Sequence, residues 1–235
     1  DMDKYHQFYI NGQWQDPIEG VVACDVVNPA DEQVIAQIAL GSAADVDCAV
    51  MAARTAFEFF SQTSVKDRLA LLQEIVDVYQ RRYEDIALAI SREMGAPLAF
   101  SQSEQASSGL DHIQEAMSTL EGFRWEARVG NAIVHKEPIG VIGMITPWNW
   151  PINQIACKVA PALAAGCTMV LKPTEVAPVN AIIFAQILHE AGVPKGVFNL
   201  VNGMGDCVGE AMSAHPDIDM MSFTGSTRAG VCVAQ

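Results

Sequence analysis

Positive charge is scarce in this sequence. Its 14 lysine and arginine residues face 28 aspartate and glutamate residues, which gives a formal charge of −14 over 235 residues. A chain of this charge repels phosphate backbones and anionic membranes unless basic side chains gather locally. No basic cluster occurs along it. We therefore expect neither nucleic-acid binding nor binding to a membrane surface.

Cysteines and histidines at metal-ligand spacing are also missing. The five histidines show no such spacing on one helical face. The cysteines are scattered without zinc-type or thioredoxin-type pairs, at Cys24, Cys48, Cys157, Cys167, Cys207 and Cys232. This pattern predicts no metal site and fits a reducing cytoplasm.

The sequence has no visible export signal and no uninterrupted membrane span. Residues 1–14 are polar and aromatic, without the charged start, apolar core and cleavage site of a signal peptide. The most apolar stretch, Ile155 to Leu171, is interrupted by Lys158, Pro161 and Gly166. We expect it to form a buried helix followed by a buried strand.

Half of the residues are apolar, which is enough to bury a substantial core. Aromatic and β-branched residues flank Asn11-Gly12 and predict a β-hairpin over residues 7–14. Apolar residues then recur at helical spacing behind a capping serine at Ser42. A second helix is predicted from Ser64 to about Gly95, and a third from about residue 97 to 123.

The pattern becomes strand-like after Arg124, where residues 132–137 alternate and residues 139–145 are typical of a buried strand. Short apolar strands then alternate with helical segments: strand 168–171 with helix 178–191, strand 197–201 with helix 206–213, and strand 220–223 with a helix that begins near Ser226. Repeated strand-helix units predict an α/β fold with a parallel, doubly wound, Rossmann-like sheet and right-handed crossovers.

Ligands of a doubly wound sheet bind outside the carboxyl ends of its strands, so the turn after Ile145 is a candidate site. Two prolines fix this turn and start the next helix, which would hold Asn149 rigidly with its amide free to donate. Such a donor suits an oxyanion. The alternative is a turn asparagine that satisfies local backbone groups. The flanking Trp148 and Trp150 are either cofactor walls or ordinary core.

A second candidate turn, Lys172-Pro173-Thr174-Glu175, follows the strand over residues 168–171. A lysine and a carboxylate at a strand end can hydrogen-bond the two hydroxyls of a ribose, and the carboxylate disfavours a 2′-phosphate. That arrangement favours NAD over NADP. A solvated ion pair at a helix start explains the same residues.

Two further turns have the composition of phosphate-binding loops. Gly203 to Gly209 departs by one residue from the usual dinucleotide fingerprint, and Asp206 adds negative charge there. A glycine turn needed only for close packing is the alternative. Gly225 and Ser226 begin the last helix, whose exposed amides suit phosphate oxygens. A simple serine N-cap would explain Ser226 without a ligand.

Taken together, these segments resemble the aldehyde dehydrogenase superfamily over essentially the whole chain. The resemblance is carried by the order and approximate spacing of six segments: Tyr9 to Trp14, Val27 to Ala30, Pro147 to Pro151, Leu171 to Glu175, Gly192 to Asn199, and Ser222 to Ser226. It implies NAD(P)-dependent oxidation of an aldehyde to a carboxylic acid. In that chemistry a cysteine thiolate attacks the aldehyde, hydride passes to the nicotinamide, and a water activated by a glutamate hydrolyses the thioester.

The resemblance also assigns roles to residues. Asn149 matches the oxyanion donor, and Lys172 and Glu175 match the ligands of the adenosine ribose. With NAD expected rather than NADP, the remaining cofactor-binding residues are predicted to be Ile145, Thr146, Pro147, Trp148, Gly205, Gly209, Phe223, Thr224, Gly225 and Ser226. Asn153 and Gln154 fall on the helix that walls the family's aldehyde tunnel, which suggests a polar or carboxylate-bearing aldehyde.

The sequence departs from the family in two catalytic segments. Neither the family's Glu-Leu-Gly-Gly base segment nor its Gly-Gln-Xaa-Cys nucleophile segment occurs before Gln235, and we assign none of the six cysteines as nucleophile. The last helix also shows no cap, glycine stop or proline at its carboxyl end. We therefore expect the amino-terminal, cofactor-binding half of a longer enzyme, inactive by itself.

The resemblance divides the chain into residues 1–122, a hairpin and helices; residues 123–138, an oligomerisation arm; and residues 139–235, the Rossmann-like part. The arm implies a homodimer or homotetramer of the complete protein. Two other functions stay open: a non-catalytic nucleotide-binding or structural module, and a semialdehyde dehydrogenase that transfers the acyl group to coenzyme A.

Overall fold

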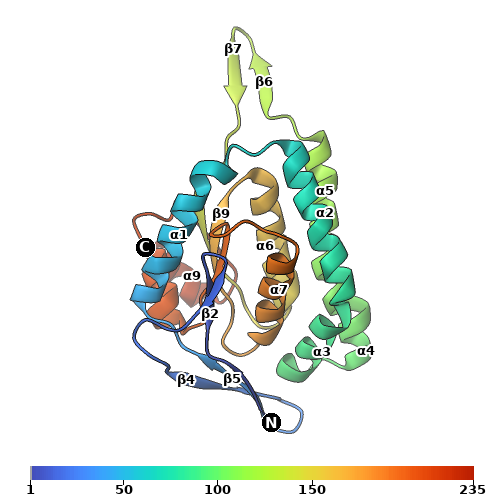
Figure 1. Ribbon diagram of the computed structural model, residues 1–235, viewed down its shortest axis with the longest axis vertical. Coiled ribbons are helices and arrows are strands. Elements are labelled where there is room, and N and C mark those ends of the chain that lie inside the picture. The colour runs from blue at the N-terminus through green and yellow to red at the C-terminus, as the bar shows by residue number, and fades with distance from the viewer. Residues whose placement is uncertain (1) are drawn as a thin grey trace.

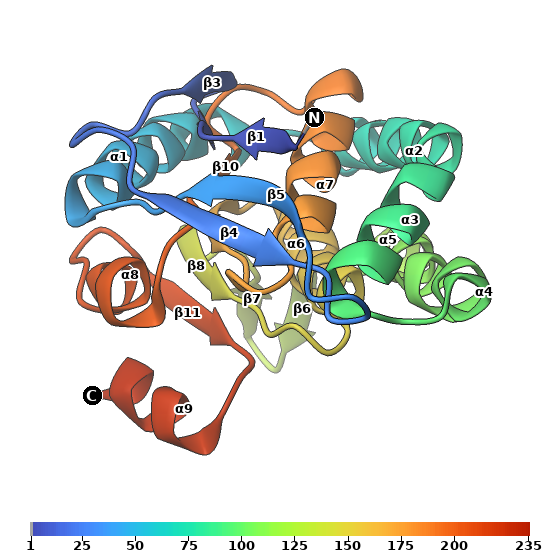
Figure 2. The same cartoon turned by 90° about the horizontal axis from the view of Figure 1, so that it is seen from below.

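The computed structural model describes residues 2–235, so Asp1, the first residue of the predicted 1–122 segment, lies outside the described residues. A six-stranded sheet lies between layers of helices, with a three-stranded sheet beside it (Figures 1 and 2). A separate two-stranded hairpin projects from one end of the body (Figure 1).

The strands are β1 Asp3–Tyr5, β2 Phe8–Ile10, β3 Gln13–Gln15, β4 Ala23–Val27, β5 Val34–Ala39, β6 Glu126–Val129, β7 Ala132–His135, β8 Val141–Ile145, β9 Thr168–Lys172, β10 Phe198–Leu200 and β11 Met220–Phe223. The helices are α1 Ala43–Phe60, α2 Val65–Arg81, α3 Tyr83–Met94, α4 Leu98–Phe100, α5 Ala106–Gly122, α6 Pro151–Ala165, α7 Val179–Glu190, α8 Glu210–Ser213 and α9 Thr227–Ala234. Two π-helical turns, η1 Ser101–Gln105 and η2 Gly205–Gly209, precede α5 and α8.

The main sheet has the order β11-β8-β9-β10-β2-β3. Strands β8 to β11 run parallel, which confirms the predicted doubly wound α/β sheet. The predicted hairpin is also confirmed: β2 and β3 pair antiparallel around Asn11 and Gly12, whose φ values are 54° and 75°. These two positive φ angles match the turn type that Asn-Gly favours in hairpins. The hairpin adds two antiparallel strands to the edge of the same sheet.

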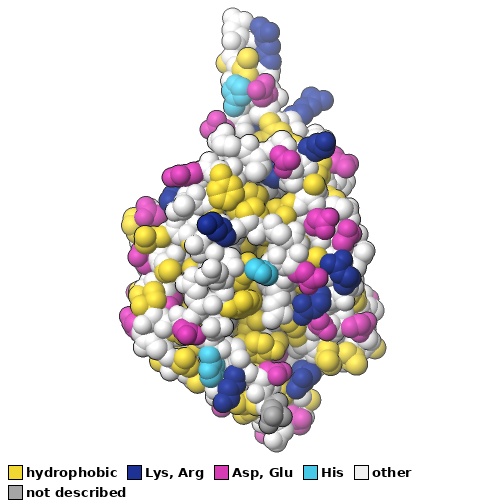
Figure 3. Space-filling view, in the orientation of Figure 1, with side chains coloured by type: hydrophobic (Ala, Val, Ile, Leu, Met, Phe, Trp, Pro, Cys, Tyr) yellow, Lys and Arg dark blue, Asp and Glu magenta, His cyan; other side chains and the backbone are white. Residues whose placement is uncertain are grey.

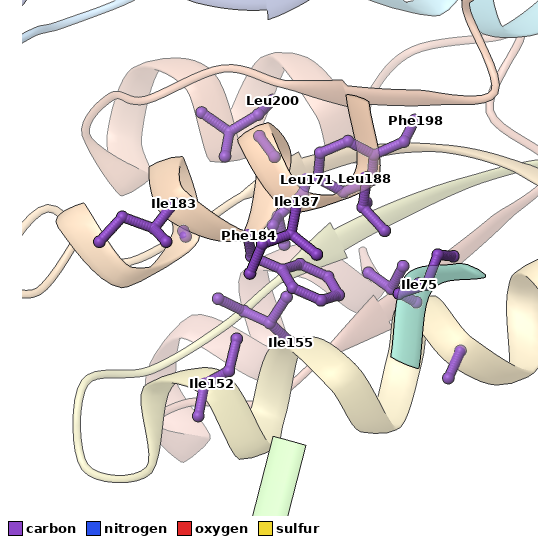
Figure 4. Close-up of a cluster of buried hydrophobic side chains, with 14 of the residues drawn as sticks. Ile75, Ile152, Ile155, Leu171, Ile183, Phe184, Ile187, Leu188, Phe198 and Leu200 are labelled. Atoms are coloured by element: carbon purple, nitrogen blue, oxygen red, sulfur yellow. The ribbon is translucent and has the colours of Figure 1, made fainter. Parts of the chain in front are cut away.

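Helices cover both faces of the main sheet. Helices α1 and α8 lie on one face, and α6 and α7 lie on the other, with α2 and α5 packed outside α6 (Figure 2). Figure 4 shows the core on the second face, where Phe184 of α7 points toward Ile155 of α6 and Phe198 of β10 lies near Leu188. Strand β9 lies in the centre of the sheet, and all five of its residues are buried.

The predicted helix from Ser64 to about Gly95 is wrong in one respect, because it is two helices. It breaks at Arg82, whose φ and ψ are −104° and 12°. The Arg82 guanidinium hydrogen-bonds Asp85 on α3 and Gln186 on α7. The helical spacing of apolar residues continues through this position, so the sequence pattern did not indicate the break. The third predicted helix contains α4, the π turn η1 and α5.

The three-stranded sheet β1-β5-β4 was not predicted. Its strands β1 and β4 are largely exposed, so their apolar alternation is weak. Strand β6 is exposed throughout and pairs only with β7, inside the predicted arm. The boundaries at residues 122 and 138 stay a prediction, although β2 and β3 of the first segment join the sheet of the third.

Among residues 2–235 no helix combines the length and apolarity that a membrane span needs.

Asn199 joins the amino-terminal hairpin to the parallel strands. Its fully buried side chain accepts a hydrogen bond from the Asn11 backbone N–H at 2.9 Å. Its amide donates to the carbonyls of Met169 at 3.1 Å and Gly196 at 2.9 Å. One side chain therefore ties β2, β9 and β10 together.

We predict that Asn199→Ala lowers the free energy of unfolding by about 2–3 kcal/mol, because it leaves buried backbone groups without partners. Denaturant unfolding of the protein measures this loss. The matched variant Asn131→Ala changes an exposed turn residue of the projecting hairpin and should stay within about 0.5 kcal/mol of wild type. Equal losses in the two variants would refute the role given to Asn199.

Candidate functional site

The carboxyl ends of three parallel strands meet at one edge of the sheet. Ile145 of β8 lies opposite Lys172 of β9 on one side and Phe223 of β11 on the other. The backbone N–H of Thr146 donates to the Lys172 carbonyl at 3.3 Å, and that of Thr224 donates to the Ile145 carbonyl at 3.1 Å. The predicted turns therefore converge in space.

The chain order of the strands reverses at β8. From β8 the chain steps to β9 and β10 on one side and then returns to β11 on the other side. Crevices at such switch points are where open α/β sheets bind ligands. The turns after β8 and β11 lie at this switch point.

The turn after β8 exposes two of the residues that were predicted to face a ligand. Trp148 is 54% exposed and Asn149 is also exposed, whereas Thr146 is buried. Trp150 is half-buried and packs edge-on against the exposed Phe100, with ring centroids 5.7 Å apart. Among the described hydrogen bonds none involves the Asn149 side-chain amide, which leaves it available to a ligand.

The π turn η1 holds this turn from outside the sheet, and sequence patterns gave no sign of it. Gln105 is buried, and its Nε2 donates to the backbone carbonyl of Asn149 at 3.4 Å. π-Helical turns are frequent at functional sites. In the sequence, residues 101–105 are polar and merge with a helical pattern, so only the structure separates them.

Lys172 and Glu175 form an ion pair after β9, with Nζ and Oε2 3.3 Å apart. The Lys172 side chain is 3% exposed and also donates to the Pro173 carbonyl at 3.0 Å. Burial lowers the pKa of Lys172, and the neighbouring Glu175 carboxylate opposes that change. The Glu175 side chain, at 30% exposure, is the half of the pair that faces solvent. The two residues do form the ion pair of the alternative explanation, but that explanation expected a solvated pair, and Lys172 is buried.

The glycine turn after β10 forms the π turn η2. A Cβ on Gly203 would lie 2.2 Å from Cγ2 of Val208, so this glycine is required for packing. A Cβ on Gly209 would make ordinary contacts with Ile145 and Lys172, whereas Gly205 faces open space. Gly209 therefore lies beside the ends of β8 and β9.

The turn after β11 leads into α9, and Ser226 caps that helix. Its Oγ accepts a hydrogen bond from the Ala229 N–H at 3.2 Å, as the N-cap alternative requires. Gly225 is exposed, and a Cβ there would lie 2.6 Å from the ring of Phe223. Phe223, Thr224, Gly225 and Ser226 line a shallow open hollow.

Lys158 of α6 was noted in the sequence only as an interruption of an apolar stretch. Its Nζ donates to Thr224 Oγ1 at 2.9 Å and to Ser222 Oγ at 3.3 Å. Burial lowers the pKa of Lys158. A lysine inside an apolar helix is rarely buried without a partner, and that rarity was the available signal.

A groove of about 290 Å³ lies between α5 and α6, lined mainly by apolar side chains. His112 and Cys157 line it, and the His112 Nε2 lies 3.0 Å from the Asn153 Nδ2. On α6 the groove is lined by Cys157, Pro161, Ala164 and Ala165, so it extends along this helix away from the Asn149 turn.

The described residues contain no group of three or more histidine, cysteine, aspartate or glutamate side chains suited to a metal ion. All six cysteines are free. Burial raises the pKa of the Cys157 thiol on α6, whereas a nucleophilic cysteine needs a lowered pKa.

The sequence of the chain is similar to that of known dehydrogenases. The chain is 52% identical over 234 residues to a 3-succinoylsemialdehyde-pyridine dehydrogenase of a Pseudomonas species, covering 99% of this chain and 49% of that protein. It therefore spans about half the length of the curated relatives that it matches.

Solved structures agree. A variant of aldehyde dehydrogenase C from Pseudomonas syringae, crystallised with NAD⁺ and octanal, is 52% identical with a TM-score of 0.96, covering 97% of this chain and 47% of that one. An aldehyde dehydrogenase from Bartonella henselae is 47% identical with a TM-score of 0.97, covering 99% and 50%. The model of the aldehyde dehydrogenase family matches residues 14–235, and the chain belongs to that family.

Proposed function

We propose that the protein containing this chain oxidises an aldehyde to a carboxylic acid with NAD, and that this chain supplies the cofactor-binding half. The observation that carries the proposal is the convergence of the predicted turns at one sheet edge, where β8 lies between β9 and β11 and the Asn149 amide is exposed in the turn after β8. Family membership and relatives crystallised with NAD⁺ support it.

The residues at this edge fit a dinucleotide. Thr146 Oγ1 is buried without a partner among the described residues, and a Cβ on Gly205 would meet no atom within 4 Å. Glu175 would hold the adenosine ribose, with Lys172 orienting its carboxylate. The amides at the start of α9, with Ser226 and Gly225, would face the phosphates. Bound NAD would supply the hydride acceptor.

The remaining predicted residues would line the cofactor site. Ile145 and Pro147 lie at the end of β8, and Gly209 lies against Ile145. Trp148 would cover the cofactor from its exposed position, and Phe223 with Thr224 would form the opposite wall. Asn149 would donate its amide to the oxygen of the reacting aldehyde, where negative charge develops.

The nucleophile and the base are proposed to lie in other segments of the whole protein. None of the six cysteines lies in the family's nucleophile context. A non-catalytic nucleotide-binding module is the main alternative, and an enzyme that transfers the acyl group to coenzyme A is another.

The experiment that separates them uses the full-length natural protein with NAD⁺ and an aldehyde panel, with and without coenzyme A. NADH formation without the thiol supports the proposal, thiol-dependent turnover supports the acylating enzyme, and no turnover with any aldehyde supports the module.

The proposed partners are a small aldehyde and further copies of the same chain, in the cytoplasm. The hairpin β6–β7 supports a homodimer or homotetramer, because it projects from the body with Val129 63% and Ile133 62% exposed (Figure 1). Charged side chains of both signs are spread over the face in Figure 3 without a broad basic patch. This distribution and the charge of −14 argue against nucleic-acid and membrane binding.

The names of two relatives mention different aldehydes. One is named for a semialdehyde of a pyridine compound, and another was crystallised with octanal. In this chain the polar pair His112 and Asn153 lies beside a groove that is otherwise mostly apolar. We propose an aldehyde with a polar group near the pair and an apolar portion in the groove. A preference of the full enzyme for long unbranched alkyl aldehydes would contradict this.

Asn149→Ala is expected to lower kcat for aldehyde oxidation by about 10²- to 10³-fold, because it removes a preorganised oxyanion donor. The affinity for NAD⁺ should change little. Steady-state kinetics and NAD⁺ titration of the full-length protein measure both effects. Asn153→Ala, one helical turn further along, is the matched control, and its kcat should fall far less for a small aldehyde. A similar loss in both variants would argue against the assignment of Asn149.

Glu175→Gln is expected to reduce the preference for NAD over NADP by about tenfold, because it removes a negative charge that repels the 2′-phosphate. The ratio of kcat/KM values for the two cofactors measures this preference. Glu190→Gln, at the carboxyl end of α7, is the control and should leave the ratio unchanged. An unchanged ratio in Glu175→Gln would show that this carboxylate does not face the ribose.

A further inference from the structure

Glu93 is a buried carboxylate that the proposed chemistry does not use. It lies near the end of α3, and its side chain is 1% exposed. One carboxylate oxygen accepts the Val179 N–H at 2.6 Å. The other accepts the Asn180 N–H at 2.8 Å and the Asn180 Nδ2 at 2.7 Å. All three donors belong to the first two residues of α7.

The start of α7 lacks a cap of its own. Its N-cap residue is Pro178, which has no side-chain acceptor. The exposed N–H groups at a helix start normally require one. Glu93 supplies this acceptor from a different helix, and its negative charge suits the positive end of the helix dipole.

Glu93 has no basic partner. Among residues 2–235 no ion pair includes it. Burial raises the pKa of Glu93 to about 7, and the hydrogen bonds from Asn180 and Val179 oppose the rise. A buried carboxylate is costly unless its hydrogen bonds are satisfied. A helix cap alone requires only a neutral side chain such as serine or asparagine.

The hydrogen bonds continue from Glu93 into the turn that precedes α7. Asn180 Nδ2 also donates to the Ala177 carbonyl at 2.8 Å, two residues after Glu175. Within the same turn, Thr174 Oγ1 accepts the Val176 N–H at 3.3 Å. Residues 172–178 are thereby fixed at both ends, by β9 at one and by the carboxylate of Glu93 at the other.

We propose that Glu93 is a positioning residue for the cofactor, which fixes residues 172–178 so that Glu175 and Lys172 meet the adenosine ribose in a single geometry. The inference rests on the proposed function. It adds a residue from α3 that contacts neither the cofactor nor the reacting atoms.

The test is Glu93→Gln in the full-length protein. The glutamine oxygen can still accept from Asn180, but its NH₂ group then faces the Val179 N–H, so two donors oppose each other and the helix start must shift. The dissociation constant of NAD⁺, measured by calorimetric titration, should rise about tenfold, equivalent to about 1.4 kcal/mol. The dissociation constant of AMP should rise by the same factor, because the affected contacts lie on the adenosine half. At saturating NAD⁺, kcat should stay within about twofold of wild type.

Asp67→Asn is the matched control. Asp67 also caps a helix start with its carboxylate, through Ser64 at the beginning of α2, and α2 carries none of the proposed cofactor residues. It should leave both dissociation constants unchanged. A second variant, Asn180→Ala, keeps the charge of Glu93 but removes the link to Ala177, and it should weaken AMP binding in the same direction if Glu93→Gln does not fold.

A double variant provides an independent measure. If Glu93 acts through Glu175, the effects of Glu93→Gln and Glu175→Gln on AMP affinity should combine to less than their sum. Full additivity, unchanged AMP affinity in Glu93→Gln, or equal weakening in Asp67→Asn would overturn the role of Glu93. Wild-type protein that binds neither NAD⁺ nor AMP would overturn the proposed function itself.

Discussion

The parallel ladder between β11, β8 and β9 is the constraint on which the candidate site depends. Its register places Ile145 between Lys172 and Phe223, so three chain segments leave the sheet at one level. A shift by one residue would turn each end residue to the opposite face. The register of β8 and β9 is fixed because these two strands are almost fully buried, with α1 packed against both and α6 packed against β9.

The sheet fixes where the turns begin, but side chains from helices fix where they go. Gln105 holds the turn after β8, Glu93 holds the start of α7 after β9, and Lys158 bonds to the hydroxyls of β11 and its turn. Each of these three polar side chains comes from a helix and makes a hydrogen bond to the neighbouring segment. The helical layer therefore supports the site as well as covering the core.

The sequence allowed the prediction of features that depend on local patterns. Asn11-Gly12 gave the hairpin, Ser42 gave the start of α1, and alternating strands and helices gave the parallel sheet. Features that depend on tertiary contacts were missed. At the helix break, Arg82 hydrogen-bonds Gln186, which lies more than 100 positions away in the chain. The sheet β1-β5-β4 has too few buried residues to leave a clear alternation.

The candidate site shows the same division. The positions of the turns could be predicted from the ends of the strands. For single residues, however, the sequence did not decide between a structural role and a ligand-binding role. Ser226 does cap its helix, and Lys172 does pair with Glu175. Neither contact opposes a ligand role, because a capped helix start still presents its remaining amides. Gly203, not Gly205 or Gly209, is the glycine that packing requires.

The unsatisfied polar groups near the turn after β8 give the strongest physical reason to regard this region as a site. Thr146 Oγ1, Ser101 Oγ and Gln105 Oε1 are buried without partners among the described residues. Such groups are uncommon in folded proteins and each costs about 1–3 kcal/mol when nothing satisfies it. Two belong to the π turn and one to the turn that carries Asn149. The described residues hold five further buried atoms of this kind, on Arg68, Trp125, Asn180 and Asn202. The three near this turn therefore support a site together with the exposed Asn149 amide of the same turn, and not by their number.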